Sequence, residues 1–465
     1  MRTVAESRAA AGGQSRPRLR HLIWGAGQVF SFETAFLLFI FAAVYKNDPR
    51  FAWFPGDMSV VFFCLSLIAG LVPLLRGGLF YLPGIKAVCA GVILVLWIAA
   101  SQVWSPGEIY ATVKLTETVA GNLWCLIATA MIISSSRVRV WRFLILLLVF
   151  GVVTAVNYTI TSITVPESSR IDYYLGLGRL VGLAALVALA LWLRSPPLSA
   201  RGPALLAAFA LCGYVLLKGG GRNPAVSVAV GALVPLLLSF RLPRGQLVIS
   251  RRILASLGLI AVLAFVVTYL AVSDANSLRT LQRFDSLVSN IERGEPANPR
   301  LKLWQHAVDY WSERPLVGHG VGAWPILYLG RDRRHYPHNM ILELLVEFGV
   351  VGLVLFAGLV LVLARRVSLR RLREDPALML AVMLCINTFI NAMTSGDISD
   401  NRTLFAMLGL LAMRPPGGPT GAAIEGRPSH LRALNLRRAD SLQTTRGGQV
   451  AANSPCSKRS TRALR

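Results

Sequence analysis

Long apolar runs dominate this chain, and short polar stretches separate each run from the next. A run of about 20 apolar residues can cross a lipid bilayer as a helix, whereas a helix of a soluble protein is apolar on one face only. Twelve runs are predicted to form membrane-spanning helices: 24–44, 58–75, 84–103, 112–134, 141–162, 176–193, 203–217, 223–240, 252–272, 339–364, 376–394 and 402–413. The pattern therefore predicts an all-α polytopic integral membrane protein.

The composition agrees with this prediction. Hydrophobic residues make up 54% of the chain and charged residues only 15%, whereas soluble domains contain about 25% charged residues. The first run contains Glu33 and is followed by no small-residue cleavage site. It is therefore predicted to be a retained helix and not a removed signal peptide.

The net charge of +25 is explained by where the basic residues lie, so no nucleic-acid partner is predicted. If the amino terminus lies inside the cell, the basic clusters at 16–21, 136–142, 241–252 and 364–375 all fall on the inner side. Membrane proteins place excess Lys and Arg in cytoplasmic loops. Both termini are therefore predicted to be cytoplasmic.

The predicted organisation has five parts. They are a basic cytoplasmic segment (1–22), spans one to nine (23–272), a large external loop (273–337) with an amphipathic helix (298–315), spans ten to twelve (338–414) and a disordered basic cytoplasmic tail (415–465). The six cysteines form no CxxC pair, so neither a disulfide framework nor a thiolate metal site is predicted. The chain also has no DxD, HExxH, Walker or GxSxG sequence, and no metal or cofactor is expected.

The external loop contains a predicted helix with clear start and stop signals. Asn298 can cap it, a proline follows, and Pro315 ends it. A helical wheel places Arg300, Trp304, Ala307 and Trp311 on one face, with Leu301 and Val308 beside them. The tryptophans could equally anchor a surface helix on the membrane. Arg300 lies in the first turn, where unpaired backbone N–H groups can bind an anion.

Two further groups of residues could bind phosphate near the outer surface. In KGGGRNP, Gly221 and Arg222 stand before span eight, where exposed N–H groups, the helix terminus and a guanidinium together favour an anion. Non-specific contact with lipid phosphates is the alternative for this loop. Arg170 and Arg179, in PESSRIDYYLGLGR, could bind phosphate or sugar, or could extend towards the membrane surface.

The stretch RDRRHYPHNMILELLVEFGVVG combines basic residues with carboxyl groups inside a span. His338 and Asn339 begin span ten, and Glu343 and Glu347 follow on the same helix face as Asn339. Intramembrane carboxylates normally face a bundle interior or a wet cavity. A neutral imidazole suits a general base, although a histidine at a helix start often serves only as a cap or interface residue. The sequence assigns no partners to Glu33, Lys114 or Glu117, which also lie at membrane depth.

These features together resemble the O-antigen ligase family. The resemblance rests on the Gly-Arg break before a span, an RLxLW helix leading to PLVGHGVG, and PHNMILELLVEFGVVG, which is similar to the family's His-Asn, Leu-Glu, Glu and Gly pattern. It covers roughly residues 30–413, and its specific parts are 216–224 and 298–352. The resemblance implies a GT-C-like helical fold with short helices in the large periplasmic loop.

The resemblance also implies a reaction. A completed polysaccharide would pass from undecaprenyl diphosphate to lipid A–core oligosaccharide on the periplasmic side of the bacterial inner membrane, among inner-membrane lipids. Arg222 and Arg300 resemble the family's diphosphate-binding arginines, and His338 resembles its catalytic histidine. His338 would deprotonate the acceptor hydroxyl, with inversion at the anomeric carbon and without metal. Glu343 or Glu347 would orient a partner.

Other functions remain open at this point. An O-antigen polymerase or a protein O-oligosaccharyltransferase would use the same lipid-linked donor with a different acceptor. A transporter or flippase would instead use Glu33, Glu117, Glu343 and Glu347 as a proton or substrate path. The sequence gives neither the sugars of donor and acceptor nor the oligomeric state.

Overall fold

The computed structural model describes residues 31–46, 49–51, 53–75, 81–164, 174–196, 199, 201–239, 289, 293, 300–394 and 396–416. The predicted span 252–272, the segments 1–22 and 273–288, the helix start at Asn298 and nearly all of the tail 415–465 lie outside the described residues. The regular elements within the described residues are helices.

The first half of the chain forms α3 (Phe32–Ile40), α4 (Ala42–Tyr45), η1 (Pro49–Phe51), α5 (Met58–Leu75), α6 (Leu82–Ala100), η3 (Ser101–Trp104), α7 (Ile109–Glu117), η4 (Thr118–Leu123), α8 (Trp124–Ile127), η5 (Ala128–Ile133), α9 (Arg137–Thr164), α10 (Tyr174–Trp192), α11 (Arg201–Lys218) and α12 (Arg222–Ser239). The second half forms α15 (Arg300–Glu313), α16 (Ala323–Leu329), α17 (Met340–Ala364), α18 (Leu369–Glu374), α19 (Pro376–Ala392), η8 (Ile398–Asp400) and α20 (Arg402–Leu410). Two of these elements, η4 and η5, are π-helical.

Every predicted span that lies within the described residues coincides with a helix or a run of helices. Seven of these helices are long and apolar enough to cross a membrane: Met58–Leu75, Leu82–Trp104, Ile109–Ile133, Arg137–Thr161, Arg201–Lys218, Arg222–Ser239 and Met340–Ala364. Gly176–Trp192 and Pro376–Ala392 are shorter apolar helices. A multi-pass membrane protein is therefore supported, whereas the total of about twelve spans and the GT-C-like fold remain predictions.

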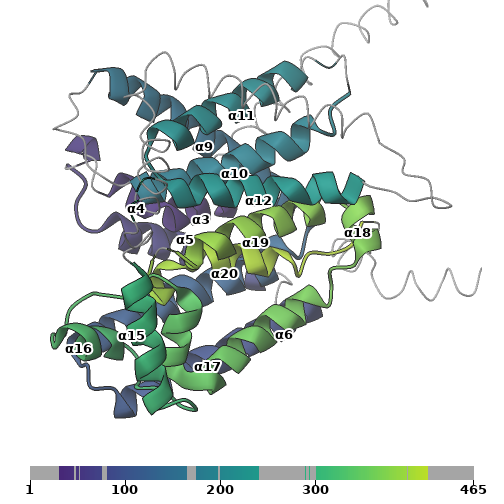
Figure 1. Ribbon diagram of the computed structural model, residues 1–465. Coiled ribbons are helices and arrows are strands. Elements are labelled where there is room, and N and C mark those ends of the chain that lie inside the picture. Colours follow the sequence, from purple (N-terminus) through teal and green to yellow (C-terminus); the bar gives the residue numbers. More distant parts are fainter. Residues whose placement is uncertain are drawn as a thin grey trace, which may run out of the picture. The chain divides into compact units, whose positions relative to one another are not determined.

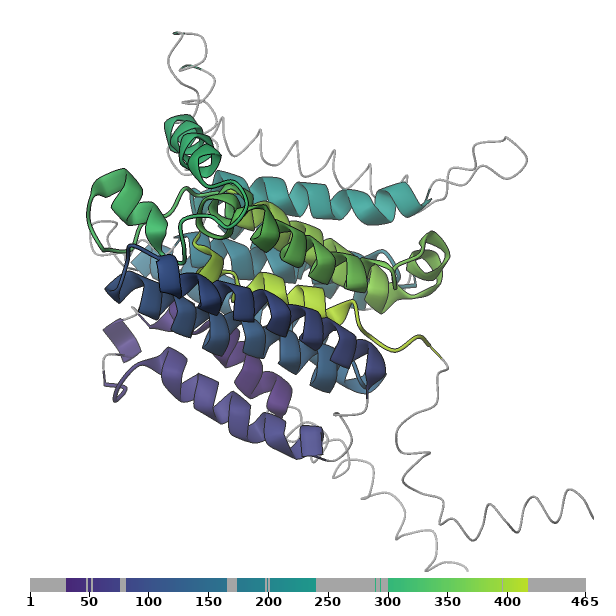
Figure 2. The ribbon, with the colours of Figure 1, turned by 90° about the horizontal axis from the view of Figure 1, so that it is seen from below.

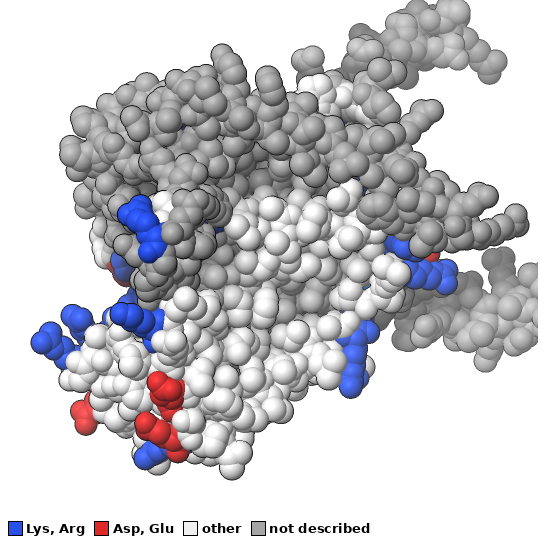
Figure 3. All heavy atoms as spheres, viewed as in Figure 1, with Lys and Arg blue, Asp and Glu red and all other residues white. Residues whose placement is uncertain are grey.

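The long helices run roughly side by side between two ends (Figure 1; Figure 2). One end carries α15 and α16, and the other carries α18. Charged side chains gather near these ends, with a broad uncharged surface between them (Figure 3). At the α18 end, Arg137 donates to both oxygens of Asp375 at 2.8 and 2.5 Å. This ion pair brings the basic clusters 136–142 and 364–375 to the same end, as their charge predicts.

Helix α10 forms the centre of one half of the bundle and contacts α9, α11, α12 and α19. Its residues from Leu180 to Leu189 are buried. Small residues allow the neighbours to approach closely: a Cβ at Gly178 would lie 2.9 Å from the side chain of Pro224 in α12. Close packing over small residues is typical of membrane helices. It fixes the first turns of α10, which carry Arg179, beside the start of α12.

Helix α17 is broken at Gly349, which has φ 65° and ψ −167°. The loop that follows α15 lies in the break and satisfies the freed backbone groups. Val350 and Val351 donate to the carbonyls of Pro315 and Leu316 at 2.8 and 3.2 Å, and His319 and Gly320 donate to Val346 and Glu347 at 2.9 and 2.8 Å. Backbone groups at membrane depth must be paired within the protein, so this loop and α17 form one unit.

Helix α15 packs on α17 and α16 through a small apolar cluster. Ala307 is fully buried, and Leu303, Tyr310 and Trp311 contact the cluster. Leu301 and Val308, which the helical wheel places beside this face, are 43% and 46% exposed. The packed face turns instead towards Leu303 and Tyr310, because the helix has α16 on that side.

Candidate active site

The end of α19 and the segment that follows it bring together three elements that carry predicted site arginines. Asn223, next to Arg222, donates to the side-chain oxygen of Asn391 at 3.1 Å. Arg300, the first residue of α15, donates to the carbonyl of Thr394. A Cβ at Gly396 would lie 3.0 Å from Nη2 of Arg179. Residues 391–396 are therefore the place where these elements meet.

Both predicted phosphate-binding arginines stand at the start of a helix. Arg222 begins α12 and Arg300 begins α15. Before Arg222 the chain turns through Gly220, whose φ is 81° and whose neighbour Gly221 is buried. A first helical turn presents unpaired N–H groups and positive potential. The two helix starts and their guanidinium groups therefore make this region favourable for an anion.

His338 has an unusual backbone conformation, with φ 58°. It lies between Pro337, whose carbonyl accepts a 3.1 Å hydrogen bond from Trp304, and Asn339, whose side chain caps α17. The Trp304 contact ties α15 to the histidine, so this tryptophan has a role within the protein. Nδ1 of His338 is buried and has no hydrogen-bond partner within the described residues.

The electrostatic surroundings keep His338 neutral. Burial, together with the positive charge of Arg300 and the neighbouring His335, lowers its pKa to about 4. The ring of Tyr336 lies edge-on to the imidazole at 4.5 Å between centroids. A neutral imidazole has a lone pair that can accept a proton, and the nearby charge shows that Arg300 and His338 act on one another.

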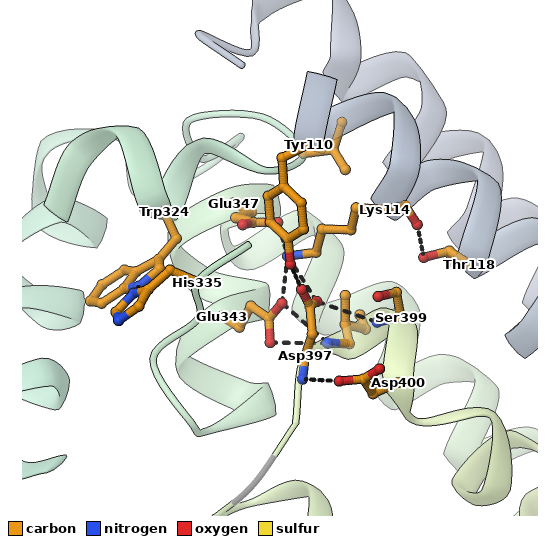
Figure 4. Close-up of polar contacts among 12 residues, drawn as sticks. Tyr110, Lys114, Thr118, Trp324, His335, Glu343, Glu347, Asp397, Ser399 and Asp400 are labelled. Atoms are coloured by element: carbon orange, nitrogen blue, oxygen red, sulfur yellow. Dashed lines mark hydrogen bonds and ion pairs between the residues drawn. The ribbon is translucent and has the colours of Figure 1, made fainter. Parts of the chain in front are cut away.

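Glu343 and Glu347 are fully buried and face the bundle interior, as the spacing predicted (Figure 4). Nζ of Lys114 lies 2.5 Å from a Glu343 oxygen, 2.7 Å from a Glu347 oxygen and 3.1 Å from an Asp397 oxygen. Tyr110 donates its hydroxyl to Asp397, and the N–H of Ile398 donates to Glu343 at 3.1 Å. Among the described contacts, none joins either glutamate to His338.

Sequence reasoning missed several residues that hold this region together. Asp397 and Asp400 form a capping box at η8, and Arg334 donates to Asp400. Burial lowers the pKa of Arg334, but Asp400 outweighs that effect and raises it. Asp332 accepts from the first three N–H groups of the α7 region, those of Glu108, Ile109 and Tyr110, at 3.0, 2.8 and 3.0 Å. The one signal in the sequence that could have indicated Asp332, Asp397 and Asp400 is the number of aspartates in these loops.

The remaining predicted residues have the following places. Arg170 lies outside the described residues. Arg179 lines a small pocket together with Thr388, Asn391, Asp400, Asn401, Thr403 and Leu404. Glu33 pairs with Arg139 and Arg142 at 3.1 and 3.4 Å, and Glu117 accepts from Ser399 at 2.8 Å. These contacts give partners to the polar residues that the sequence left unassigned.

The described residues contain no group of three or more His, Cys, Asp or Glu side chains that could hold a metal ion.

Residues 207–357 match a family model described as O-antigen ligase. The match includes α12, α15, α16 and the first part of α17, and with them Arg222, Arg300 and His338. This part of the chain, about a third of its length, is therefore similar to O-antigen ligases. Comparison with curated proteins finds no match.

Proposed function

Because the chain matches the O-antigen ligase family over residues 207–357, we propose that it transfers a glycan from undecaprenyl diphosphate to the lipid A–core oligosaccharide. The reaction takes place on the periplasmic side of the bacterial inner membrane. The proposal rests chiefly on one observation: Arg300, Asn223 beside Arg222, and Arg179 all reach residues 391–396, with His338 close enough for Arg300 to shift its pKa.

In the proposed reaction, the donor sugar is already activated by its diphosphate. A hydroxyl oxygen of the acceptor attacks the anomeric carbon, and the bond from that carbon to the phosphate oxygen breaks. The hydroxyl proton passes to the neutral imidazole of His338, and undecaprenyl diphosphate leaves with the bonding electrons. Arg222 and Arg300 stabilise the charge that develops on the leaving group. Attack opposite the leaving group inverts the anomeric carbon.

The pairing of Arg300 with His338 has a physical rationale. Without donor, the guanidinium disfavours protonation of the imidazole. A bound diphosphate would neutralise that guanidinium, and an anion near an imidazole favours its protonated form. Donor binding would therefore make His338 a stronger base at the moment when a proton must be accepted.

The pH dependence of the reaction follows from this arrangement. His338 must be neutral to accept a proton, and its pKa is about 4 in the donor-free protein. Since kcat/KM reports the groups of the free enzyme, it should stay nearly level down to about pH 5, halve near pH 4, and fall about tenfold per pH unit only below that. Arg300→Gln removes a positive charge, so the acid limb should move to higher pH. Profiles of initial rate at low donor concentration measure this shift. An acid limb near pH 6.5 that Arg300→Gln leaves in place would contradict it.

The proposed function is tested with purified full-length protein, an undecaprenyl-diphosphate glycan and lipid A–core acceptor, with a chelator present throughout. The expected product is a lipopolysaccharide band of higher mass. Longer undecaprenyl-linked chains formed from donor alone would identify a polymerase instead. Movement of the donor across a bilayer without any covalent change would identify a transporter.

A further inference from the structure

Lys114 lies at the centre of a buried ionic cluster that the proposed reaction does not use. The cluster is defined here as Tyr110, Lys114, Glu343, Glu347 and Asp397 (Figure 4). The side chains of its lysine and three acids are 0% exposed. If all four groups were ionised, the cluster would carry a net charge of −2, which is costly in a protein interior. Lys114 is therefore the cation that allows three carboxyl groups to share one site.

The cluster joins three segments that are far apart in the sequence. Lys114 belongs to α7, the glutamates belong to the first two turns of α17, and Asp397 belongs to the loop before η8. The N–H of Ile398 also donates to Glu343. Lys114 thus fixes the loop 396–400 against the part of α17 that directly follows His338 and Asn339.

The same loop continues into the candidate active site. Three residues before Asp397, the carbonyl of Thr394 accepts from Arg300, and Gly396 approaches Arg179. On the other side, Asp397 and Asp400 form the capping box of η8, and Asp400 accepts from Arg334. A shift of Asp397 would therefore move the groups that Arg300 and Arg179 contact on one side and Arg334 contacts on the other.

We propose that Lys114 is a positioning residue: it holds the segment 394–400 against the start of α17 and so sets the distance between Arg300 and His338. Glycosyl transfer depends on this distance because a displacement of about 1 Å at reacting groups can cost about 100-fold in rate. The inference rests on the proposed function for its catalytic consequence, but the positioning itself can be measured without activity.

The test uses a double variant that keeps the formal charge of the cluster, and a single variant as its control. Lys114→Met alone leaves three buried carboxyl groups without a cation and can fail to fold. Lys114→Met/Glu347→Gln removes one positive and one negative charge and so keeps the formal charge of the cluster. Glu347 is the acid to change, because its oxygens have no hydrogen-bond partner within the described residues apart from the ion pair with Lys114. Glu347→Gln alone is the control.

Two readouts are expected to change in the double variant. Its kcat should fall by about 10- to 100-fold with a donor KM within about threefold of the wild type. Backbone hydrogen exchange in residues 394–401 should rise in the double variant but not in Glu347→Gln, while exchange in α10 stays unchanged. Thermal unfolding in detergent shows that each variant is folded.

Three outcomes would overturn the proposal. Unchanged exchange in 394–401, or wild-type kcat in a folded double variant, would show that Lys114 does not position the loop. A double variant recovered only in unfolded form would show a requirement of the whole fold. If the wild type transfers no glycan while exchange in 394–401 changes as expected, the proposed function fails and the positioning role stands.

Discussion

Replacing His338 with asparagine is expected to reduce glycan transfer by about 10²- to 10⁴-fold, the usual contribution of a general base. Asparagine is the appropriate replacement because His338 has φ 58°, a left-handed conformation that asparagine tolerates and that strains alanine. The variant therefore loses the proton acceptor and keeps the backbone. Donor affinity should change little, because the arginines that are proposed to bind the diphosphate are intact. Initial rates and donor titration measure the two effects separately.

Two other variants make this result interpretable. Arg300→Gln should weaken donor binding by about 10- to 100-fold, since it removes a charge-assisted hydrogen bond to a phosphate. His306→Asn changes a half-exposed histidine of α15 that stacks on Tyr310 and lies tilted against Tyr328. Transfer by this variant should stay within about twofold of the wild type. Full transfer by His338→Asn would exclude His338 as the base.

The largest loss of stability is expected from Gly349→Ala. The new Cβ would lie 2.2 Å from the carbonyl oxygen of Leu316, which cannot retreat because it accepts from Val351. The left-handed φ of 65° adds strain for any residue with a side chain. A backbone clash together with this strain should lower the free energy of unfolding by more than about 4 kcal/mol. Little folded protein should be recovered, as judged by gel filtration and thermal unfolding in detergent.

Gly358→Ala provides the control within the same helix. Gly358 has helical geometry, and a Cβ there meets no heavy atom within 4 Å. This change should leave stability equal or raise it by up to about 1 kcal/mol, because alanine restricts the unfolded chain and favours helix. If Gly349→Ala unfolds at the same temperature as Gly358→Ala, the break in α17 does not exist in solution.

Helix positions could be predicted closely because the signal is local. The run 58–75 coincides with α5, and the run 339–364 differs from α17 by one residue at its start. Length and apolarity along a single stretch determine whether it forms a membrane helix, so no knowledge of neighbours was needed. The same holds for the buried face of Glu343 and Glu347, which spacing alone indicates.

Pairings across the bundle could not be predicted in this way. Lys114 pairs with Glu343, which lies 229 positions away in the sequence. The residues around either one do not indicate that the other is its partner. The break at Gly349 was missed for a related reason: FGVVGLVLF is apolar throughout and gives no sign that a loop enters the helix. The glycines at 318 and 320 indicate a turn. The sequence does not indicate that this turn contacts the broken part of α17.

The break in α17 has a mechanical consequence. Four hydrogen bonds join the loop after α15 to the helix, and all of them are between backbone groups. The close approach requires glycine at position 318, where a Cβ would lie 2.5 Å from the backbone of Glu347. Helix α15 therefore cannot swing independently on a flexible tether. A force that displaces Arg300 at one end of α15 acts, through Pro315 and Leu316 at the other, as a lever on the turn of α17 that carries Glu347. Any movement of α15 is therefore expected to move the turn of α17 that carries Glu347 as well.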